Sequence, residues 1–135
     1  MSSQAQPLTE QEKAKLGLPQ DDLIFWYPIN VVLTALQQLL AGTVQIDNDA
    51  NFECRWFISS QTGLYSATFT DRLRSRPLMP SNINVENLAG TAQLPFILPR
   101  PLILLRTAVI AGQFTDRSNA PNTVQFCFAG YKLNL

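Results

Sequence analysis

The sequence predicts an all-β protein, an antiparallel sandwich preceded by a short N-terminal helical arm. Two segments, residues 64–70 and residues 124–128, alternate between apolar and polar side chains, as half-buried strands do. Turn-forming residues recur along the chain at the spacing that is typical of a sandwich or barrel. The side chains predicted to face the core in these two segments are Tyr65, Ala67, Phe69, Val124, Phe126 and Phe128.

The composition favours a structural or binding protein over an enzyme. The 135 residues fit one domain, and the charge balance is ten basic against ten acidic side chains. Histidine is absent, which excludes Ser-His-Asp and Cys-His triads and histidine-ligated metal sites. Charged residues make up 15%, while 11 Gln and 9 Asn supply much of the polar surface. We therefore expect no catalysis, no cofactor, no bound metal and no dedicated nucleic-acid binding.

Residues 1–22 differ from the rest and are predicted to form an arm, with the sandwich domain at residues 23–135. The sequence Thr9–Glu12 reads as a capping box that begins a helix of about two turns, and Gly17 with Pro19 ends it. The arm lacks the basic start and apolar stretch of a secretion signal. We also expect no membrane span, because arginines and prolines interrupt the most apolar region, residues 94–112.

Two loops are predicted to close β-hairpins, and one segment is ambiguous. The loops are Ser59–Gly63 and Asp116–Asn122, both rich in turn-forming residues. The segment Val31–Leu40 has good helix formers at its centre and could be a helix that ends at Gly42. Its apolar residues do not fall on one helical stripe, so we expect a strand.

Two cysteines, Cys54 and Cys127, are too few for a disulfide scaffold. Both lie in apolar runs, which indicates two free, buried thiols in a reducing compartment. The alternative is one bridge between Cys54 and Cys127 across two strands, which would need Cα atoms about 5–6 Å apart.

The segment Asp47–Asn51 matches the first ligand positions of a calcium loop, since Asp47, Asp49 and Asn51 are spaced two apart. The match then fails, because Phe52 stands where a calcium loop needs glycine. The favoured interpretation is a tight turn in which these side chains bond to nearby backbone amides.

Three successive aromatic residues, Phe25, Trp26 and Tyr27, cannot all face one core, because strand side chains alternate. At least one is therefore predicted to be buried between subunits or against a partner, where Trp and Tyr often act as anchors. The alternative is a division between core and ordinary surface.

Three arginines, Arg72, Arg74 and Arg76, recur with period two and would project from one face of a strand. Such a stripe could guard an edge strand against aggregation, and Pro77 supports an edge position. It could also dock on an acidic protein surface or, less favourably, on nucleic-acid phosphate.

The order of turns and strands in the second half resembles that of small β-sandwich virion proteins of tailed bacteriophages, of the capsid cement or decoration type. The resemblance covers Asp47 to Leu135 and carries no catalytic residues. Its elements are the turn Asp47–Phe52, the run from Asp71 to Leu78, the segments Asn82–Leu88, Leu94–Phe96 and Pro99–Leu102, the turn Asp116–Asn119 and the closing run Phe128–Leu133.

The resemblance implies a jelly-roll-like sandwich that forms dimers or trimers and binds the major capsid protein. The location that it implies is the capsid exterior of a virion assembled in the bacterial host cytoplasm. A second hypothesis is a carbohydrate-binding or adaptor β-sandwich of a phage tail or head fibre, with Trp26 or Trp56 as the sugar platform. The predicted partner-binding residues lie in the Leu8–Leu18 arm, the aromatic run and the arginine stripe: Leu8, Leu16, Leu18, Phe25, Trp26, Tyr27, Arg72, Arg74 and Arg76.

Overall fold

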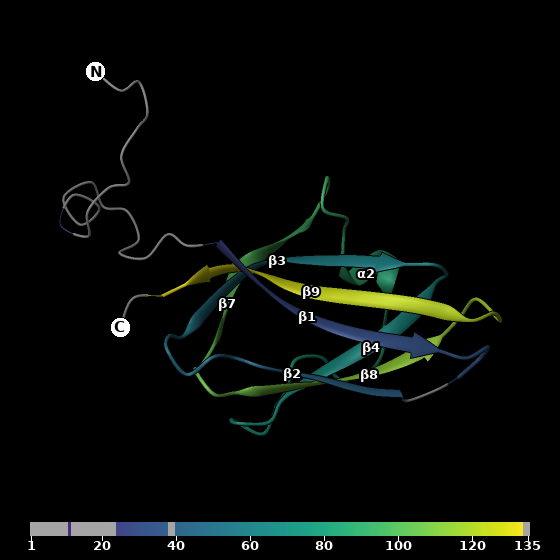
Figure 1. Cartoon of the computed structure of the whole chain (residues 1–135), viewed down its shortest axis with the longest axis horizontal. Helices are drawn as coiled ribbons and strands as arrows, with labels where there is room; N and C mark the ends of the chain where they lie inside the picture. The colour runs from purple at the N-terminus through teal and green to yellow at the C-terminus, as the bar shows by residue number, and fades with distance from the viewer. Residues whose placement is uncertain (1–10, 12–23, 38–39, 134–135) are drawn as a thin grey trace, which may run out of the picture.

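Two antiparallel β-sheets packed face to face form the protein in a computed structural model that describes residues 11, 24–37 and 40–133 (Figure 1). Sheet A has the order β1 (Ile24–Leu33), β9 (Asn122–Lys132), β3 (Phe52–Gln61) and β7 (Phe96–Leu104). Sheet B has the order β2 (Leu40–Gln45), β8 (Val109–Asp116), β4 (Tyr65–Asp71) and β5 (Arg76–Pro77). The short strand β6 (Ile83–Asn84) also pairs with β4 and leads into a single helical turn, α2 (Val85–Leu88).

The predicted all-β sandwich is confirmed. The predicted helical arm lies outside the described residues, apart from Gln11, and so do Leu8, Leu16 and Leu18.

Successive long strands alternate between the two sheets, so both predicted hairpins are wrong. Strands β3 and β4 flank Thr62–Leu64 but belong to different sheets, and β8 and β9 do the same around residues 117–121. Both predicted loops contain a reversal of the chain, although Ser59–Gln61 of the first one belong to β3. Turn chemistry does not decide whether the next strand pairs with the previous one or packs across from it, since the core makes that choice.

The core is a cluster of aromatic rings contributed by both sheets. Phe69 of β4 lies 4.6 Å from Phe126 and 5.2 Å from Phe128 of β9, measured between ring centroids. The alternation predicted for β4 and β9 is confirmed, because the residues expected inside are at most 1% exposed. They are Tyr65, Ala67, Phe69, Val124, Phe126 and Phe128.

A β-bulge in β3 allows Arg55 and Trp56 to occupy a position that would otherwise hold one residue. The register with β9 passes from Cys54–Gly130 to Trp56–Ala129, which leaves Arg55 as the extra residue. Gly130 is needed here, because a Cβ atom on it would collide with the carbonyl oxygen of Glu53.

The two cysteines lie on opposite faces of sheet A, and both are free. Cys54 is completely buried in the core, and burial raises the pKa of its thiol to about 12. Cys127 is half-buried on the outer face, where burial also raises its thiol pKa. The disulfide alternative is therefore wrong, and the prediction that both thiols are buried holds fully for Cys54 alone.

The ambiguous segment is strand at both ends, not helix. Val31–Leu33 completes β1 and Leu40 begins β2, with a turn between them. Leu36 adopts a φ of 56°, which closes the turn and is incompatible with a continuous right-handed helix. Residues 38 and 39 lie outside the described part.

Asp116 and Asn122 tie together three connections at one end of the sandwich. The buried Asp116 carboxylate accepts hydrogen bonds from the Leu36 amide (2.8 Å), the Ser118 hydroxyl (2.6 Å) and the Asn122 side-chain amide (3.2 Å). Asn122 also donates to the carbonyl of Gly63 at 2.8 Å. Burial alone would raise the pKa of Asp116, but these donors outweigh it and hold the pKa well below its usual range.

We expect Asp116→Asn to lower the free energy of unfolding at pH 7 and to flatten its dependence on acid. The folded pKa of Asp116 lies below the unfolded value of about 3.9, so its contribution is complete at neutral pH. That contribution is lost as the pH falls through the unfolded pKa toward the folded one. Urea unfolding of both proteins from pH 7 to pH 2 measures this, and equal loss of stability on acidification would contradict the assignment.

Candidate interaction surface

The outer face of sheet A is apolar, although it points to solvent. On β1, Ile24 is 45% exposed and Trp26 is 54% exposed. On β7, Ile97 is 68% exposed. Isolated exposed apolar residues are ordinary, but a contiguous group of them is typical of an interaction site.

These residues belong to one row that crosses the sheet. The register places Trp26 opposite Ala129, Ala129 opposite Trp56, and Trp56 opposite Ile97. Neighbouring strands lie about 4.8 Å apart, so the two tryptophans stand roughly 10 Å apart with one small residue between them. Ala129 points outward and is still only 1% exposed, which indicates that its bulky neighbours cover it.

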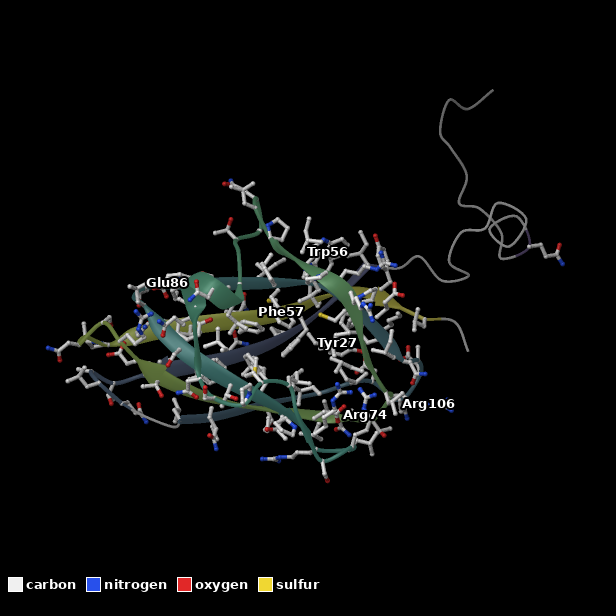
Figure 2. All side chains as sticks on the ribbon, turned by 180° about the vertical axis from the view of Figure 1, so that it is seen from behind. Tyr27, Trp56, Phe57, Arg74, Glu86 and Arg106 are labelled. Atoms are coloured by element: carbon white, nitrogen blue, oxygen red, sulfur yellow. The ribbon has the colours of Figure 1, made fainter. Side chains whose placement is uncertain are left out.

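We call this surface the tryptophan face and define it as Ile24, Trp26, Trp56, Ile58, Ile97 and Tyr131. Trp56 packs on Tyr131 with ring centroids 5.6 Å apart, which fixes the indole in place. Figure 2 shows Trp56 on the outer side of the sheet, with Phe57 and Tyr27 on the core side. Trp56 is therefore the anchored residue of this face, whereas Trp26 and Ile97 extend further into solvent.

The charges beside the tryptophan face neutralise each other. Arg55 forms an ion pair with Glu53 at 2.7 Å, and its guanidinium carbon lies 5.7 Å from the centre of the Tyr131 ring. Beyond the row of Pro28, Cys127 and Ile58, the outer face becomes polar and uncharged, and there Gln125 donates to Asn30 at 2.9 Å. The arrangement has an apolar centre with a polar rim, as protein interfaces do.

The predicted aromatic run divides as the alternation rule requires. Tyr27 is 3% exposed and belongs to the core, where its hydroxyl accepts a hydrogen bond from the Asp47 amide at 3.2 Å. Phe25 is partly buried and packs on Tyr27 at 4.9 Å. Trp26 alone of the three is exposed. Neither the part of Ile97 nor the proximity of Trp56 to Trp26 can be predicted from the sequence, because both depend on the pairing of distant strands.

The predicted arginine stripe is not a strand. Residues 72–75 form a turn, and only Arg76 belongs to a strand, the edge strand β5. The buried Asp71 carboxylate bends the chain by accepting the amides of Leu73 (3.0 Å) and Arg74 (3.4 Å). The same carboxylate pairs with the Arg74 guanidinium at 2.9 Å, so Arg74 is anchored to the fold, although it is exposed like Arg72 and Arg76. The expected edge position of Pro77 is confirmed.

A lysine, rather than calcium, lies against the Asp47–Asn51 turn. The Lys132 ammonium group lies 2.9 Å from Asp47 and 3.0 Å from Asp49, and 4.2 Å from the centre of the Phe25 ring. Burial works against the charged form of Lys132, but the two carboxylates outweigh it and raise its pKa. The favoured turn is correct, although the aspartates bind Lys132 and only Asn51 binds a backbone amide from elsewhere, that of Arg106 at 2.9 Å.

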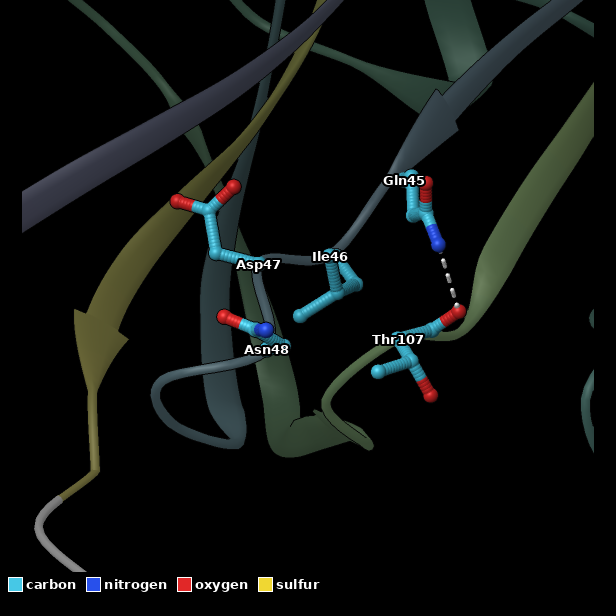
Figure 3. Close-up of a pocket in the computed structure, with 5 residues that line it drawn as sticks. All are labelled: Gln45, Ile46, Asp47, Asn48 and Thr107. Atoms are coloured by element: carbon cyan, nitrogen blue, oxygen red, sulfur yellow. Dashed lines mark hydrogen bonds between the residues drawn. The ribbon is translucent and has the colours of Figure 1, made fainter.

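A hollow of about 360 Å³ lies beside this turn and is lined by Gln45, Ile46, Asp47, Asn48 and Thr107 (Figure 3). Gln45 donates to the Thr107 carbonyl at 3.3 Å, and the Asp47 carboxylate points away from the hollow toward β9 (Figure 3). Across the described ranges, no three His, Cys, Asp or Glu side chains are grouped as a metal site would require. The hollow therefore has polar walls without a catalytic or metal-binding set.

We expect Lys132→Met to raise the pKa of Asp49. The hydrogen bond from Lys132 is the main reason that the pKa of Asp49 lies below its usual value, and methionine removes it while keeping the length of the side chain. A carbon-detected NMR titration of the Asp49 carboxyl measures the change, with Lys132→Arg as the control that keeps the cation. An unchanged Asp49 pKa in Lys132→Met would show that the ion pair does not exist in solution.

The fold and this surface define an all-β sandwich with an apolar face suited to binding another molecule. Comparisons of the chain with protein-family models, curated proteins and solved structures found no match. None of the helices in the described part has the length and apolar character needed to cross a membrane.

Proposed function

We propose that the chain is a structural virion protein that stabilises a bacteriophage capsid by binding on and between major capsid protein subunits. The observation that carries this proposal is the tryptophan face, a contiguous apolar surface on a fold whose described residues hold no metal-binding cluster. The resemblance of residues 47–135 to cement and decoration proteins supplies the capsid as the partner. The proposed location is the capsid exterior.

The strand order supports a jelly-roll assignment for the sandwich. Sheet A is ordered β1-β9-β3-β7 and sheet B β2-β8-β4-β5, so each sheet combines strands from both ends of the chain. Eight strands connected between two sheets in this interleaved manner are typical of viral capsid and lectin jelly rolls, and here β6 is added beside β4. A fold whose sheets cannot separate without breaking long-range contacts suits a protein that must resist force.

The sheet edges favour contact through a face rather than through strand addition. Three edge strands of the described sheets contain proline: Pro28 lies in β1, Pro99 and Pro101 lie in β7, and Pro77 ends β5. The edge strand β2 contains none. Proline removes a backbone donor and blunts an edge against pairing with another chain. A partner therefore gains more from the tryptophan face, where each ~100 Å² of buried apolar surface contributes about 2.5 kcal/mol before the costs of association.

The N-terminal arm and two exposed arginines are also proposed to contact partners. The Leu8–Leu18 arm would add buried contacts with neighbouring subunits, while the exposed Arg72 and Arg76 would orient the protein on an acidic surface. Self-association as a homodimer or homotrimer belongs to the same proposal.

Fractionation of assembled virions tests the proposal. We expect the chain to be present in a fixed stoichiometric ratio to the major capsid protein, and we expect Trp26→Ser combined with Trp56→Ser to lower its occupancy at least tenfold. Leu64→Ser is the matched control, because Leu64 is 44% exposed and lies outside the tryptophan face. A few copies per virion, absence from the virion, or full occupancy by the double variant would contradict the proposal.

A carbohydrate-binding role is the second candidate, and the pairing of Trp26 with Trp56 beside the polar Asn30–Gln125 row favours it. Two indole rings on one face can stack on sugar rings while amides bind hydroxyl groups. A glycan-binding screen of the purified chain separates the two functions. We expect no glycan to be retained. Retention that is lost in the double tryptophan variant would favour the tail or head-fibre role.

A further inference from the structure

A pocket of about 250 Å³ lies between β5 and β7, at the side of the sandwich where the two sheets do not meet. Its walls are apolar, and Leu78, Met79 and Leu98 line it together with the buried Phe57. Two exposed arginines, Arg76 of β5 and Arg100 of β7, also line it. Apolar walls with cationic groups at the solvent side suit an apolar group that carries negative charge close by.

Arg74 connects the two sheets on this side of the sandwich. Its guanidinium pairs with the buried Asp71 of β4 at 2.9 Å and also donates to the carbonyl of Ile103 in β7. Ile103 follows Leu102, which lines the pocket, so this connection lies close to the pocket. The pocket is present without an occupant, so the sandwich itself loses little conformational entropy on binding.

The acidic side chains of the sandwich are not available to form ion pairs with the two pocket arginines. Among the described residues, each acidic side chain except Asp116 pairs with another cation, and Asp116 is buried at the opposite end of β8. No ion pair of Arg76 or Arg100 occurs within the described ranges. The pocket thus has uncompensated positive charge within the sandwich.

The sequence shows where the matching negative charge lies. Residues 24–133 contain eight basic and six acidic side chains, whereas residues 1–22 contain two lysines and four acidic side chains. The neutral chain is therefore divided into a sandwich with two excess positive charges and an arm with two excess negative charges. The arm also contains the leucines Leu8, Leu16 and Leu18 among or next to its charged residues.

We propose that the β5–β7 pocket binds the N-terminal arm of a second copy of this chain, with leucine side chains in the pocket and Glu10 and Glu12 near Arg76 and Arg100. Size supports an aliphatic side chain: cavities of about 150 Å³ hold benzene, whereas drug-sized ligands occupy about 300–1,000 Å³. The inference deepens the proposed function and rests on its self-association, because it names the segment and the site that connect the copies.

Sheet order favours a second copy over the chain's own arm. The arm joins the sandwich at Ile24 of β1, while the pocket adjoins β7, the opposite edge of sheet A. Three strand spacings of about 4.8 Å separate these edges, so an arm in its own pocket would first have to pass across or around sheet A. The arm of a neighbouring copy can approach the pocket directly from solvent.

The test uses Met79 as a reporter in the purified full-length chain. The chain has two methionines, Met1 and Met79, so methyl-¹³C methionine labelling gives two resonances, and Met79→Leu identifies the one in the pocket. We expect the Met79 resonance to shift as the protein concentration rises toward millimolar, in step with dimer or trimer formation measured by sedimentation. A synthetic peptide of residues 1–22 added to dilute labelled protein should produce the same shift.

Charge variants show whether the pocket arginines bind the arm. Arg76→Gln combined with Arg100→Gln should weaken peptide binding at least tenfold, and so should a peptide carrying Glu10→Lys and Glu12→Lys. Arg72→Gln is the matched control, because Arg72 is an exposed arginine of the adjacent turn that does not line the pocket. All three arginines are exposed, and circular dichroism of each variant verifies that it is folded.

Several outcomes would overturn the proposal. These are a Met79 resonance that does not respond to the peptide, equal peptide binding by the double arginine variant, and a Met79 shift that depends on the arm but not on protein concentration. The last outcome would place the arm in its own pocket. These binding experiments use no virion, so a negative result would not contradict the proposed capsid binding. Likewise, absence of the chain from virions would not contradict binding of the arm to the pocket.

Discussion

The contact between aromatic rings of the two sheets is the interaction on which the rest of the structure depends. Phe69 of sheet B lies 4.6 Å from Phe126 and 5.2 Å from Phe128 of sheet A, measured between ring centroids, and Phe114 packs on Phe69 at 5.8 Å within sheet B. These rings fill the space between the sheets, and Tyr27, Phe52 and Phe57 extend the same core. Since side chains alternate along a strand, the register that places Tyr27 and Phe57 in this core directs their neighbours Trp26 and Trp56 outward.

Buried polar groups close the sandwich at its ends and sides. Asp116 with Asn122 fixes three connections at one end, Lys132 with Asp47 and Asp49 fixes the other, and Asp71 with Arg74 fixes the side where the sheets do not meet. Each of these groups binds residues that are distant in sequence or belong to another element. Many of the protein's charged side chains therefore form ion pairs or hydrogen bonds within the fold. The remaining ones, including Arg76 and Arg100, are available to bind another chain.

The outer surface then offers two distinct places for other chains. The tryptophan face is broad and nearly neutral, which suits a large protein surface. The β5–β7 pocket is small and cationic, which suits one anchoring side chain with acidic neighbours. The prolines of β1, β5 and β7 discourage other chains from adding a strand at these three edges. Assembly through a face and an arm would therefore not compete with aggregation at these strands.

The sequence by itself determined the strands and many of their inward faces, because side-chain alternation and turn chemistry are local properties. Tyr65, Phe69, Phe126 and Phe128 could be assigned to the core from their period of two, and the same rule required the aromatic run at Phe25–Tyr27 to divide. Tertiary structure alone decided which strands pair, since pairing depends on contacts between segments up to about a hundred residues apart. Because of this pairing, the two predicted hairpin loops instead connect strands of different sheets. The hydrogen bonds of Asp71 make the arginine segment a turn rather than a strand. Trp26 and Trp56 lie on either side of β9.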